Sequence, residues 1–247
     1  MNIIVVGATG RMGQMLCGLI ERTEGFTTVA KVSPEYVVDA GEHTYQKIAE
    51  VSEKADCIID FSHHSLTAEL CTYAKEKHLP LIIATTGQTA EEKEMINNTA
   101  KDTAVFFSAN MSLGIAMMAK MVSQAAELFG QADIEIIESH HNQKLDVPSG
   151  TALLLANAIK EAKPDAEIIV GRHENGKRKP NEIGIHSLRL GTEVGMHEVI
   201  LTTPSQSISF KHQAHSRELF ADGALKAADF ICNKDHGLYT MNDIVSQ

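Results

Sequence analysis

The alternation of short apolar runs and helix-like stretches through residues 1–111 constrains the fold more than any other feature. The β-rich runs are Asn2–Val6, Phe26–Val32, Cys57–Phe61, Pro80–Ala84 and Thr103–Phe107, and the helix-like stretches are Met12–Arg22, Gln46–Lys54, Ser65–His78 with a Ser cap, and Thr89–Lys101. Short apolar strands between helices predict a parallel sheet that is buried on both faces. With right-handed crossovers, this pattern predicts a Rossmann-like, doubly wound α/β domain over residues 1–111.

The pattern changes near Ser112, which predicts a second domain over residues 112–217. Its expected elements are a long apolar helix at Leu113–Phe129, a strand at Asp133–Glu138, a polar segment at Ser139–Ser149, a helix at Gly150–Ala162, and strands at Ile183–Leu190, Val194–Thr203 and Ser207–Lys211. Clustered strands favour a mixed or antiparallel sheet, and hence an α+β domain. A final helix at Glu218–Asn233 is expected to return residues 218–247 to the first domain. The basic segment Gly171–Asn181 is expected to be an exposed, mobile loop.

Charge and composition exclude several classes of protein. The 247 residues carry a formal net charge of −10, which argues against a nucleic-acid partner or an anionic membrane surface. No apolar run approaches the ~18 residues that span a bilayer, and the N-terminus has no targeting pattern. Four scattered cysteines are expected to be buried free thiols: Cys17, Cys57, Cys71 and Cys232. We therefore expect a cytoplasmic protein.

A glycine loop follows the first strand and leads into the first helix. It reads Gly7-Ala8-Thr9-Gly10-Arg11-Met12-Gly13, a GxxGxxG spacing in place of the standard GxGxxG. Glycines let the backbone turn tightly and approach a pyrophosphate, and the helix start presents free N–H groups and a positive dipole end. The loop predicts a dinucleotide site. A tight strand-to-helix turn without a ligand is the alternative.

The end of the second strand bears on the choice between NADH and NADPH. An acidic residue there commonly binds the ribose 2′-hydroxyl of NADH, but the chain has Ser33 at that place. Ser33 can hydrogen-bond either ribose form, and Arg11 and Lys31 can meet a 2′-phosphate. The sequence leans slightly to NADPH, and use of both nucleotides stays open.

Titratable residues concentrate between Glu135 and Ala152, at the end of a strand and the start of a helix. Reduction of a C=N or C=C bond needs a hydride, which a nicotinamide supplies, and a proton, which a His or Lys can supply near neutral pH. The free N–H groups at Ser149-Gly150-Thr151 can bind a carboxylate, and Lys144 adds positive charge. This segment therefore predicts a reductase site for an anionic substrate.

Two other interpretations of the same segment remain open at this stage. Adjacent histidines are often solvated on a surface loop. A metal site is also conceivable, with Glu138, His140, His141 and Asp146 as ligands, but the segment lacks HExxH or other recognised ligand spacing. We expect no metal.

Five motifs together resemble the dihydrodipicolinate reductase (4-hydroxy-tetrahydrodipicolinate reductase) family over nearly the whole chain. They are the glycine loop with its Gly-Arg-Met-Gly ending, Asp60-Phe61-Ser62, Ala84-Thr85-Thr86-Gly87, Ser108-Ala109-Asn110-Met111-Ser112, and His140-His141-x-x-Lys144-x-Asp146-x-Pro148-Ser149-Gly150-Thr151-Ala152. The last of them is long and specific. Two departures are Ser33, where the family commonly has an acid, and Ala84, where it commonly has glycine; we expect Ala84 to narrow the nicotinamide pocket only slightly.

The resemblance implies a role for each matching residue. It makes His140 a proton donor or acceptor and Lys144 a proton donor that also binds substrate, while His141, Gly150 and Thr151 contact the substrate. The implied contacts to NADH or NADPH are Gly7, Ala8, Thr9, Gly10, Arg11, Met12, Ser33, Ala84, Thr85, Thr86, Ser108, Ala109, Asn110 and Met111. The family is usually homotetrameric through the sheet of the second domain.

The implied reaction belongs to lysine biosynthesis by the diaminopimelate route. 4-Hydroxy-tetrahydrodipicolinate, a small cyclic dicarboxylate, loses water and is reduced by NADH or NADPH to tetrahydrodipicolinate. The rival functions are another two-domain NAD(P)-dependent dehydrogenase of amino-acid metabolism, a non-enzymatic dinucleotide sensor, and a metal hydrolase built on the histidine pair.

Overall fold

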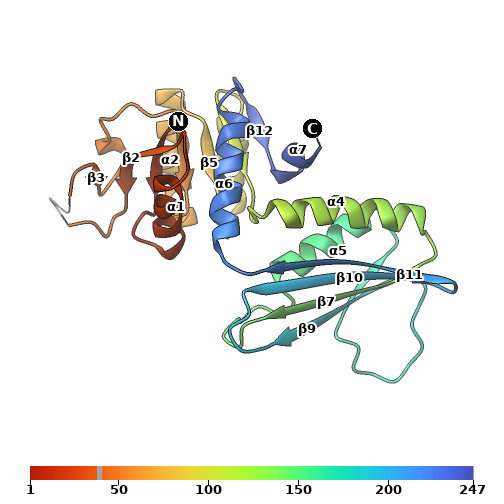
Figure 1. The fold of residues 1–247 in the computed structure, drawn as a ribbon. Coiled ribbons are helices and arrows are strands. Elements are labelled where there is room, and N and C mark those ends of the chain that lie inside the picture. Colours follow the sequence, from red (N-terminus) through yellow and green to blue (C-terminus); the bar gives the residue numbers. More distant parts are fainter. Residues whose placement is uncertain (38–40, 247) are drawn as a thin grey trace. The chain divides into compact units, whose positions relative to one another are not determined.

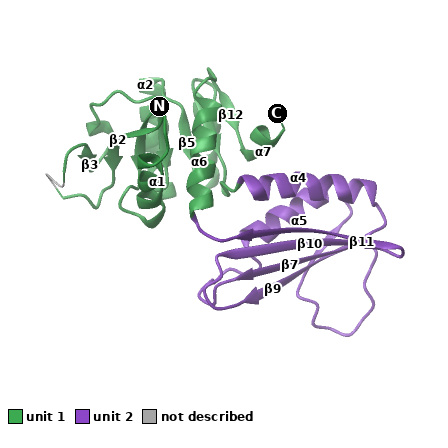
Figure 2. Ribbon diagram, in the orientation of Figure 1, with its two compact units in different colours: residues 1–112, 218–247 green, residues 113–217 purple. Residues whose placement is uncertain are grey.

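The computed structural model describes residues 1–37 and 41–246 of the chain. It divides the chain into two compact units (Figure 1, Figure 2). The first unit comprises Met1–Ser112 and Glu218–Gln247, and the second comprises Leu113–Arg217. The substrate-binding and tetramerisation roles expected of the second unit remain predictions.

Within the described residues, the first unit holds a parallel sheet in the order β12-β6-β5-β4-β1-β2-β3. Its strands are β1 (Asn2–Val6), β2 (Thr27–Val32), β3 (Thr44–Tyr45), β4 (Cys57–Asp60), β5 (Leu81–Ile83), β6 (Ala104–Phe107) and β12 (Gly237–Tyr239). The chain runs outward from β1 to β3 and then resumes on the other side of β1 with β4. This reversal places a topological switch point at the carboxyl ends of β1 and β4, where doubly wound sheets bind ligands.

Helices cover this sheet because its strands are apolar on both faces. The helices are α1 (Arg11–Glu21), α2 (Thr67–Lys77), α3 (Ala90–Thr99), α6 (Glu218–Ile231) and α7 (Met241–Val245). Leu70 of α2 and Ile96 of α3 join the core formed by Ile4 and Ile58 of the sheet. Helices α1 and α6 pack against each other, and α6 also contacts β4, β5 and β6. The predicted Rossmann-like sheet is confirmed.

The second unit pairs a mixed sheet with two helices. The sheet order is β11-β10-β7-β9-β8, with β7, β9 and β8 parallel to one another and β10 antiparallel to both β7 and β11. The elements are α4 (Leu113–Leu128), β7 (Asp133–His140), α5 (Gly150–Ala162), β8 (Glu167–Val170), β9 (Glu182–Arg189), β10 (Gly195–Thr203) and β11 (Gln206–Ala214). Helices α4 and α5 lie side by side on one face of the sheet (Figure 1). The predicted mixed sheet is confirmed.

Strand ends differ from the prediction where polar residues enter the sheet. Strand β7 continues through Ser139 to His140, whereas the sequence predicted a polar segment from Ser139 onward, because His140 pairs with Arg189 of β9. Strand β11 extends beyond the predicted strand Ser207–Lys211 because it pairs with β10 along its whole length. The short elements β3, β8, β12 and α7 were not predicted, since two to five residues carry too little periodicity to be recognised.

Two expectations for local helical structure were wrong. The predicted helix at Gln46–Lys54 is only a 3₁₀ turn, η1 (Ile48–Glu50), because Tyr45 joins the sheet and the Glu53 carboxylate accepts a hydrogen bond from the Tyr45 hydroxyl at 2.6 Å. The predicted Ser cap is also absent: helix α2 follows a second 3₁₀ turn, η2 (His64–Leu66), and its N-cap is Leu66. The side chain of Ser65 instead contacts Nδ1 of His63 at 2.9 Å.

The sequence predicted an exposed, solvated loop at Gly171–Asn181, but ion pairs hold part of this basic loop. Most of it, including Arg172, is exposed, and Arg178 is partly buried. Arg172 contacts the Glu182 carboxylate at 2.6 Å, and Arg178 contacts the Asp133 carboxylate at 2.9 Å. These ion pairs anchor the loop to β9 and β7.

The cysteines are free, as expected. Cys17, Cys57 and Cys71 are buried, and Cys232 is partly buried. Among the described residues, no helix combines the length and the apolar character needed to cross a membrane.

The glycine loop makes a prediction about stability. A Cβ atom at Gly13 would lie 2.1 Å from the carbonyl oxygen of Gly7, which is rigid backbone. Gly13→Ala is therefore expected to cost about 2 kcal/mol or more and to lower the thermal midpoint by roughly 4–8 °C. Gly18→Ala on the same helix is the matched control, because among the described residues no heavy atom beyond its chain neighbours and its own helix backbone would lie within 4 Å of a Cβ there, so Ala should stabilise by up to ~1 kcal/mol. Equal midpoints for the two variants in differential scanning calorimetry would contradict the assigned crowding.

Candidate active site

The glycine loop lies at the switch point of the first unit and is held close to the neighbouring strands. The amides of Gly7 and Ala8 both donate to the Val32 carbonyl, at 2.8 and 3.2 Å. Gly7 has φ of 78°, and a Cβ there would lie 2.7 Å from the backbone of Phe61. Only glycine satisfies both the conformation and the space at this position.

The start of α1 suits an anion. Helix α1 begins at Arg11, with Gly10 as its N-cap, and its first turn contains no acidic residue. Its first N–H groups can therefore bind a phosphate without competition from a side-chain carboxylate. Together, the tight loop and this helix start fit the pyrophosphate of a dinucleotide.

An apolar cavity of about 170 Å³ lies beside the loop in the first unit. Its lining residues are Met12, Phe61, Ala84, Ala109, Met111 and Phe220. Met12, Ala84, Ala109 and Met111 are among the expected nucleotide contacts, and the cavity brings them together. Sequence reasoning missed Phe220, which α6 contributes from the far end of the chain. The cavity wall of two aromatic and two methionine side chains suits a flat ring such as nicotinamide.

Asp60, at the end of β4, is a buried carboxylate that directly precedes Phe61 of the cavity wall. It accepts hydrogen bonds from the Ser62 amide at 2.8 Å and the Thr85 hydroxyl at 3.4 Å. Burial raises the pKa of Asp60 to about 6, despite these hydrogen bonds. The Thr85 side chain is buried here, whereas Thr86 is exposed, so a contact from Thr85 to a nucleotide would come from its backbone.

The polar residues after β6 bond to one another. The Ser108 hydroxyl donates to the Asn110 carbonyl at 2.8 Å, and the Asn110 side-chain oxygen accepts from the Ser112 amide at 2.9 Å. These bonds shape the turn that carries Ala109 and Met111 to the cavity. Direct contacts from Ser108 and Asn110 to the nucleotide remain predictions.

An acid missed in the sequence lies at the end of β2. Ser33 is buried, and its hydroxyl lies 2.7 Å from that of Thr9 in the glycine loop. The Thr9 hydroxyl also donates to Glu35 Oε2 at 2.8 Å. A turn after Ser33 therefore brings the exposed carboxylate of Glu35 to the glycine loop, although Glu35 lies two positions beyond the usual place for an acid.

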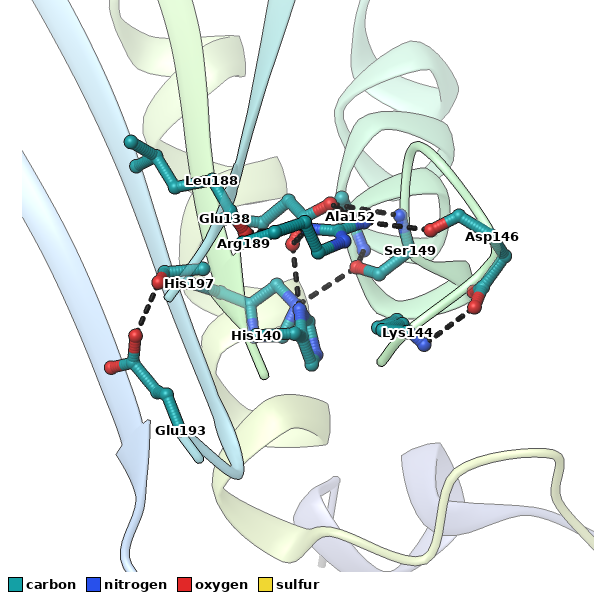
Figure 3. Close-up of polar contacts among 11 residues, drawn as sticks. Glu138, His140, Lys144, Asp146, Ser149, Ala152, Leu188, Arg189, Glu193 and His197 are labelled. Atoms are coloured by element: carbon teal, nitrogen blue, oxygen red, sulfur yellow. Dashed lines mark hydrogen bonds and ion pairs between the residues drawn. The ribbon is translucent and has the colours of Figure 1, made fainter. Parts of the chain in front are cut away.

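In the second unit, a fully buried carboxylate holds the first motif histidine (Figure 3). Glu138 Oε2 lies 2.6 Å from Nδ1 of His140, and both residues are on β7. Arg189 on β9 binds the same carboxylate through two nitrogens, at 2.9 and 3.0 Å. Burial raises the pKa of Glu138, but the bonds from Arg189 and His140 outweigh it and lower the pKa overall. Glu138 is therefore ionised at neutral pH.

His140 itself is buried, so the interpretation of a solvated histidine is wrong for this residue. Burial is the main cause that lowers its pKa, and the neighbouring Glu138 carboxylate opposes that effect. His197 of β10 lies edge-on, with 5.1 Å between the ring centroids. Nε2 of His197 contacts the Ser149 hydroxyl at 3.1 Å. Burial lowers the pKa of His197 to about 3, so this second imidazole is neutral.

A carboxylate of the chain itself lies just before the start of α5. The Asp146 side chain lies 2.8 Å from Nζ of Lys144. Burial raises the pKa of Asp146, but the contact with Lys144 and nearby backbone amides, including that of Gly150, lower it overall. Ser149 caps the helix by accepting from the Ala152 amide at 3.2 Å. Lys144 and Gly150 thus both act on the Asp146 carboxylate, while His141 and Thr151 are partly exposed nearby in the sequence. Figure 3 shows Lys144 and Asp146 on the loop that leads into α5.

A metal centre finds no support in the expected ligand set. The Glu138 carboxylate is occupied by Arg189 and His140, and Asp146 faces Lys144 instead of the histidine. In the part of the chain that the structure describes, no group of three or more His, Cys, Asp or Glu residues is arranged to hold a metal ion.

Sequence reasoning missed Arg189 and His197, which complete the histidine cluster. Both come from strands that are distant in sequence, and only the sheet register places them beside β7. The sequence did carry one signal for His197. It is a polar residue at an inward-facing position of the strand, between Gly195 and Val199.

A doubly wound sheet with a glycine loop at its switch point, joined to a unit that carries an acid–base cluster, defines a nucleotide-dependent oxidoreductase. The family model described as dihydrodipicolinate reductase, N-terminus, matches residues 1–111, and the C-terminus model matches residues 114–245. The chain therefore belongs to the dihydrodipicolinate reductase family.

Individual relatives agree with this membership. The 4-hydroxy-tetrahydrodipicolinate reductase of Caldanaerobacter subterraneus subsp. tengcongensis is 43% identical, over 100% of this chain and 98% of the relative. That of Clostridium novyi is 42% identical, over 99% and 98%. A dipicolinate-bound dihydrodipicolinate reductase from Paenisporosarcina sp. TG-14 has a TM-score of 0.84 at 24% identity and covers 98% of each chain, which shows a shared fold.

Neutral His197 makes the stability of the protein depend on pH. Its folded pKa of about 3 lies below its ordinary value of 6.5, so the unfolded chain binds the extra proton between these values. The stabilisation is complete above pH 6.5 and is lost as pH falls toward 3, by roughly 1.4 kcal/mol per pH unit. His197→Gln should flatten the fall of the unfolding free energy over this range, measured by urea titration at several pH values. Exposed His173→Gln is the control, and equal slopes for all three proteins would count against a buried neutral imidazole.

Proposed function

We propose that this chain reduces 4-hydroxy-tetrahydrodipicolinate to tetrahydrodipicolinate with NADH or NADPH, in lysine biosynthesis by the diaminopimelate route. The full-length relatives above are named for this reaction. The observation that carries the proposal is that Lys144 already holds a carboxylate just before the start of α5, close in the chain to the buried imidazole of His140. A dicarboxylate substrate needs such donors beside a group that exchanges protons.

Asp146 acts as a stand-in for one carboxylate of the substrate. One of its oxygen atoms contacts the ammonium group of Lys144 at 2.8 Å, and its side chain is more than half exposed. A substrate carboxylate can displace it, because Lys144 and the first amides of α5 then bind an equivalent anion and Asp146 turns to water. Thr151 and His141 supply further donors in this proposal. The Paenisporosarcina relative is a dipicolinate-bound reductase, which agrees with a cyclic dicarboxylate ligand for the fold.

The residues of the first unit fit a nicotinamide dinucleotide. The backbone of Gly7 to Gly13 cradles the pyrophosphate, and the cavity at Met12, Ala84 and Met111 takes the ring. When bound there, the reduced nucleotide supplies a hydride. The chain's own part is to hold the ring in an apolar, water-poor setting.

Side chains of the second unit transfer the protons in this proposal. After water leaves the 4-hydroxy substrate, the ring of the product requires one proton in addition to the hydride. His140 exchanges a proton through Nε2, because Nδ1 is engaged with Glu138. Lys144 binds the substrate and donates a proton as charge builds on the ring.

Glu35 bears on the nucleotide preference. The lean toward NADPH rested on the absence of an acid near Ser33, but the Glu35 carboxylate contacts Thr9 of the glycine loop. A carboxylate at this point accepts the 2′-hydroxyl of NADH and repels the 2′-phosphate of NADPH. Arg11 and Lys31 oppose that repulsion. We therefore propose that both nucleotides are used and that Glu35 shifts the balance toward NADH.

The assembly and the compartment follow the family in this proposal. The sheet face opposite α4 and α5 presents Ile137 and Ile200, and Leu188 is largely exposed. Covering this face with further copies of the chain would give a homotetramer, which sedimentation equilibrium measures directly. The free cysteines suit the reducing cytoplasm.

The test of function is steady-state kinetics with enzymatically generated substrate. His140→Ala is expected to lower turnover by about 10²–10⁴-fold, the range for removal of a general acid or base. Lys144→Ala is expected to raise KM and to lower kcat, because the ammonium group serves both binding and proton transfer. Oxidation of NADH is followed at its absorbance band.

Two control variants and one binding assay complete this experiment. His173→Ala and Lys160→Ala remove the same side-chain types elsewhere in the second unit and should leave turnover unchanged. Nucleotide binding without turnover in the wild-type protein would favour a sensor. Unchanged turnover in His140→Ala would remove that residue from the mechanism.

The nucleotide preference has its own test. Glu35→Gln removes one negative charge beside Thr9 and should move the ratio of NADPH to NADH affinity about 3- to 30-fold toward NADPH. Fluorescence titration of both nucleotides measures this ratio without substrate. Exposed Glu94→Gln on α3 is the matched control. An unchanged ratio in Glu35→Gln would refute a role for this carboxylate.

A further inference from the structure

Three parts of the second unit meet at the Glu138 carboxylate. From β7, His140 Nδ1 lies 2.6 Å from Oε2; from β9, Arg189 binds both oxygens; and from the loop before α5, the Ser149 amide donates to Oε1 at 3.2 Å. Glu138 has no exposed surface, so no water competes for these positions. The side chain is thus held in one orientation by donors from three directions (Figure 3).

We propose that Glu138 is a positioning residue: it holds the proton of His140 on Nδ1 and leaves Nε2 to exchange a proton with the substrate. The inference rests on the function proposed above, and it adds a residue that touches neither substrate nor nucleotide. Arg189 contributes to the same positioning, because its guanidinium keeps the buried Glu138 carboxylate ionised and oriented.

The physical basis is the tautomer of the imidazole. A carboxylate only accepts hydrogen bonds when ionised, so the ring nitrogen beside it must carry a proton in both the neutral and the charged form of His140. Nε2 is then the nitrogen that gains and loses the proton. Gly195 of β10 keeps space beside that atom, since a Cβ there would lie 3.0 Å from Nε2.

The pKa of His140 depends on the charged and titratable side chains around its imidazole. Glu138 lies on the same strand, Arg189 on β9, His197 on β10, and Lys144 on the loop before α5. His212 of β11 stands opposite His197 in the sheet register. Of these described neighbours, Glu138 alone is negative, and it is in direct contact with the His140 ring. Its removal therefore makes protonation of the imidazole less favourable.

The same carboxylate connects the imidazole to the substrate-binding loop. Arg189 donates to the carbonyl of Asp146 at 2.7 Å, and Ser149 is the N-cap of α5. The buried Glu138 carboxylate and its partner Arg189 therefore position both the His140 ring and the start of α5, where the Gly150 amide lies.

Glu138→Gln tests the proposal, because it keeps the shape and removes the charge. We expect kcat to fall roughly 10²-fold with NADH affinity unchanged. In the wild type, activity that depends on protonated His140 falls as pH rises through its pKa. This fall is the high-pH limb of the pH profile. In Glu138→Gln the limb should move to lower pH, because the imidazolium loses its anionic acceptor. A purely structural role would lower activity at every pH without moving the limb.

Nitrogen NMR of labelled histidine gives a readout that needs no substrate. In the wild type, neutral His140 should show a protonated Nδ1 and an unprotonated Nε2, and the His140 pKa should fall in Glu138→Gln. This measurement stands even if the chain fails to reduce the proposed substrate, so the two failures are distinguishable. It also remains decisive if Glu138→Gln does not fold, since a neutral wild-type ring protonated on Nε2 would overturn the proposal.

Two further variants sharpen the comparison. Glu135→Gln makes the same change on β7 and removes another carboxylate–imidazole contact, to His186 at 2.8 Å, so it should leave the pH limb in place. Glu138→Asp retains the charge and should recover part of the lost turnover and the original position of the limb. A limb that moves equally in Glu135→Gln, or that stays in place in Glu138→Gln, would refute the assignment.

Discussion

Glu138 is an ionised carboxylate without exposed surface, and burial of such a charge costs several kcal/mol unless partners compensate for it. The compensation comes from the guanidinium of Arg189, the imidazole of His140 and the amide of Ser149. Each partner belongs to a different part of the second unit. The need to satisfy one buried charge therefore determines where the end of β7, the end of β9 and the start of α5 lie relative to one another.

Both units present backbone N–H groups at a helix start, where an anion can bind. In the first unit, the start of α1 follows the glycine loop, and Gly7 and Gly13 are required because backbone atoms leave no space for Cβ. In the second unit, Lys144 holds the carboxylate of Asp146 just before the start of α5. Backbone donors at helix starts are rigid, so they fix the orientation of a ligand more tightly than long side chains do.

Local patterns made much of this predictable from sequence. The glycine loop, the apolar strands and the Ser149-Gly150-Thr151 helix start each depend on residues within a few positions of one another. Arg189 and His197 were missed because only the strand register brings them beside Glu138, and no local periodicity encodes that register. Glu35 was missed because a turn after Ser33 shifts the acid by two positions. The helix expected at Gln46–Lys54 was wrong: Tyr45 pairs with Val32 of β2, and its hydroxyl donates to the Glu53 carboxylate, which a local helical pattern does not show.

Crystals grown with NADH and dipicolinate would show directly whether the start of α5 is the carboxylate site of the substrate. We expect one carboxylate of the ligand to replace Asp146 on Nζ of Lys144 and to accept from the Gly150 amide, with the ring beside Nε2 of His140. A ligand bound elsewhere, with Asp146 still on Nζ of Lys144, would contradict the assigned site.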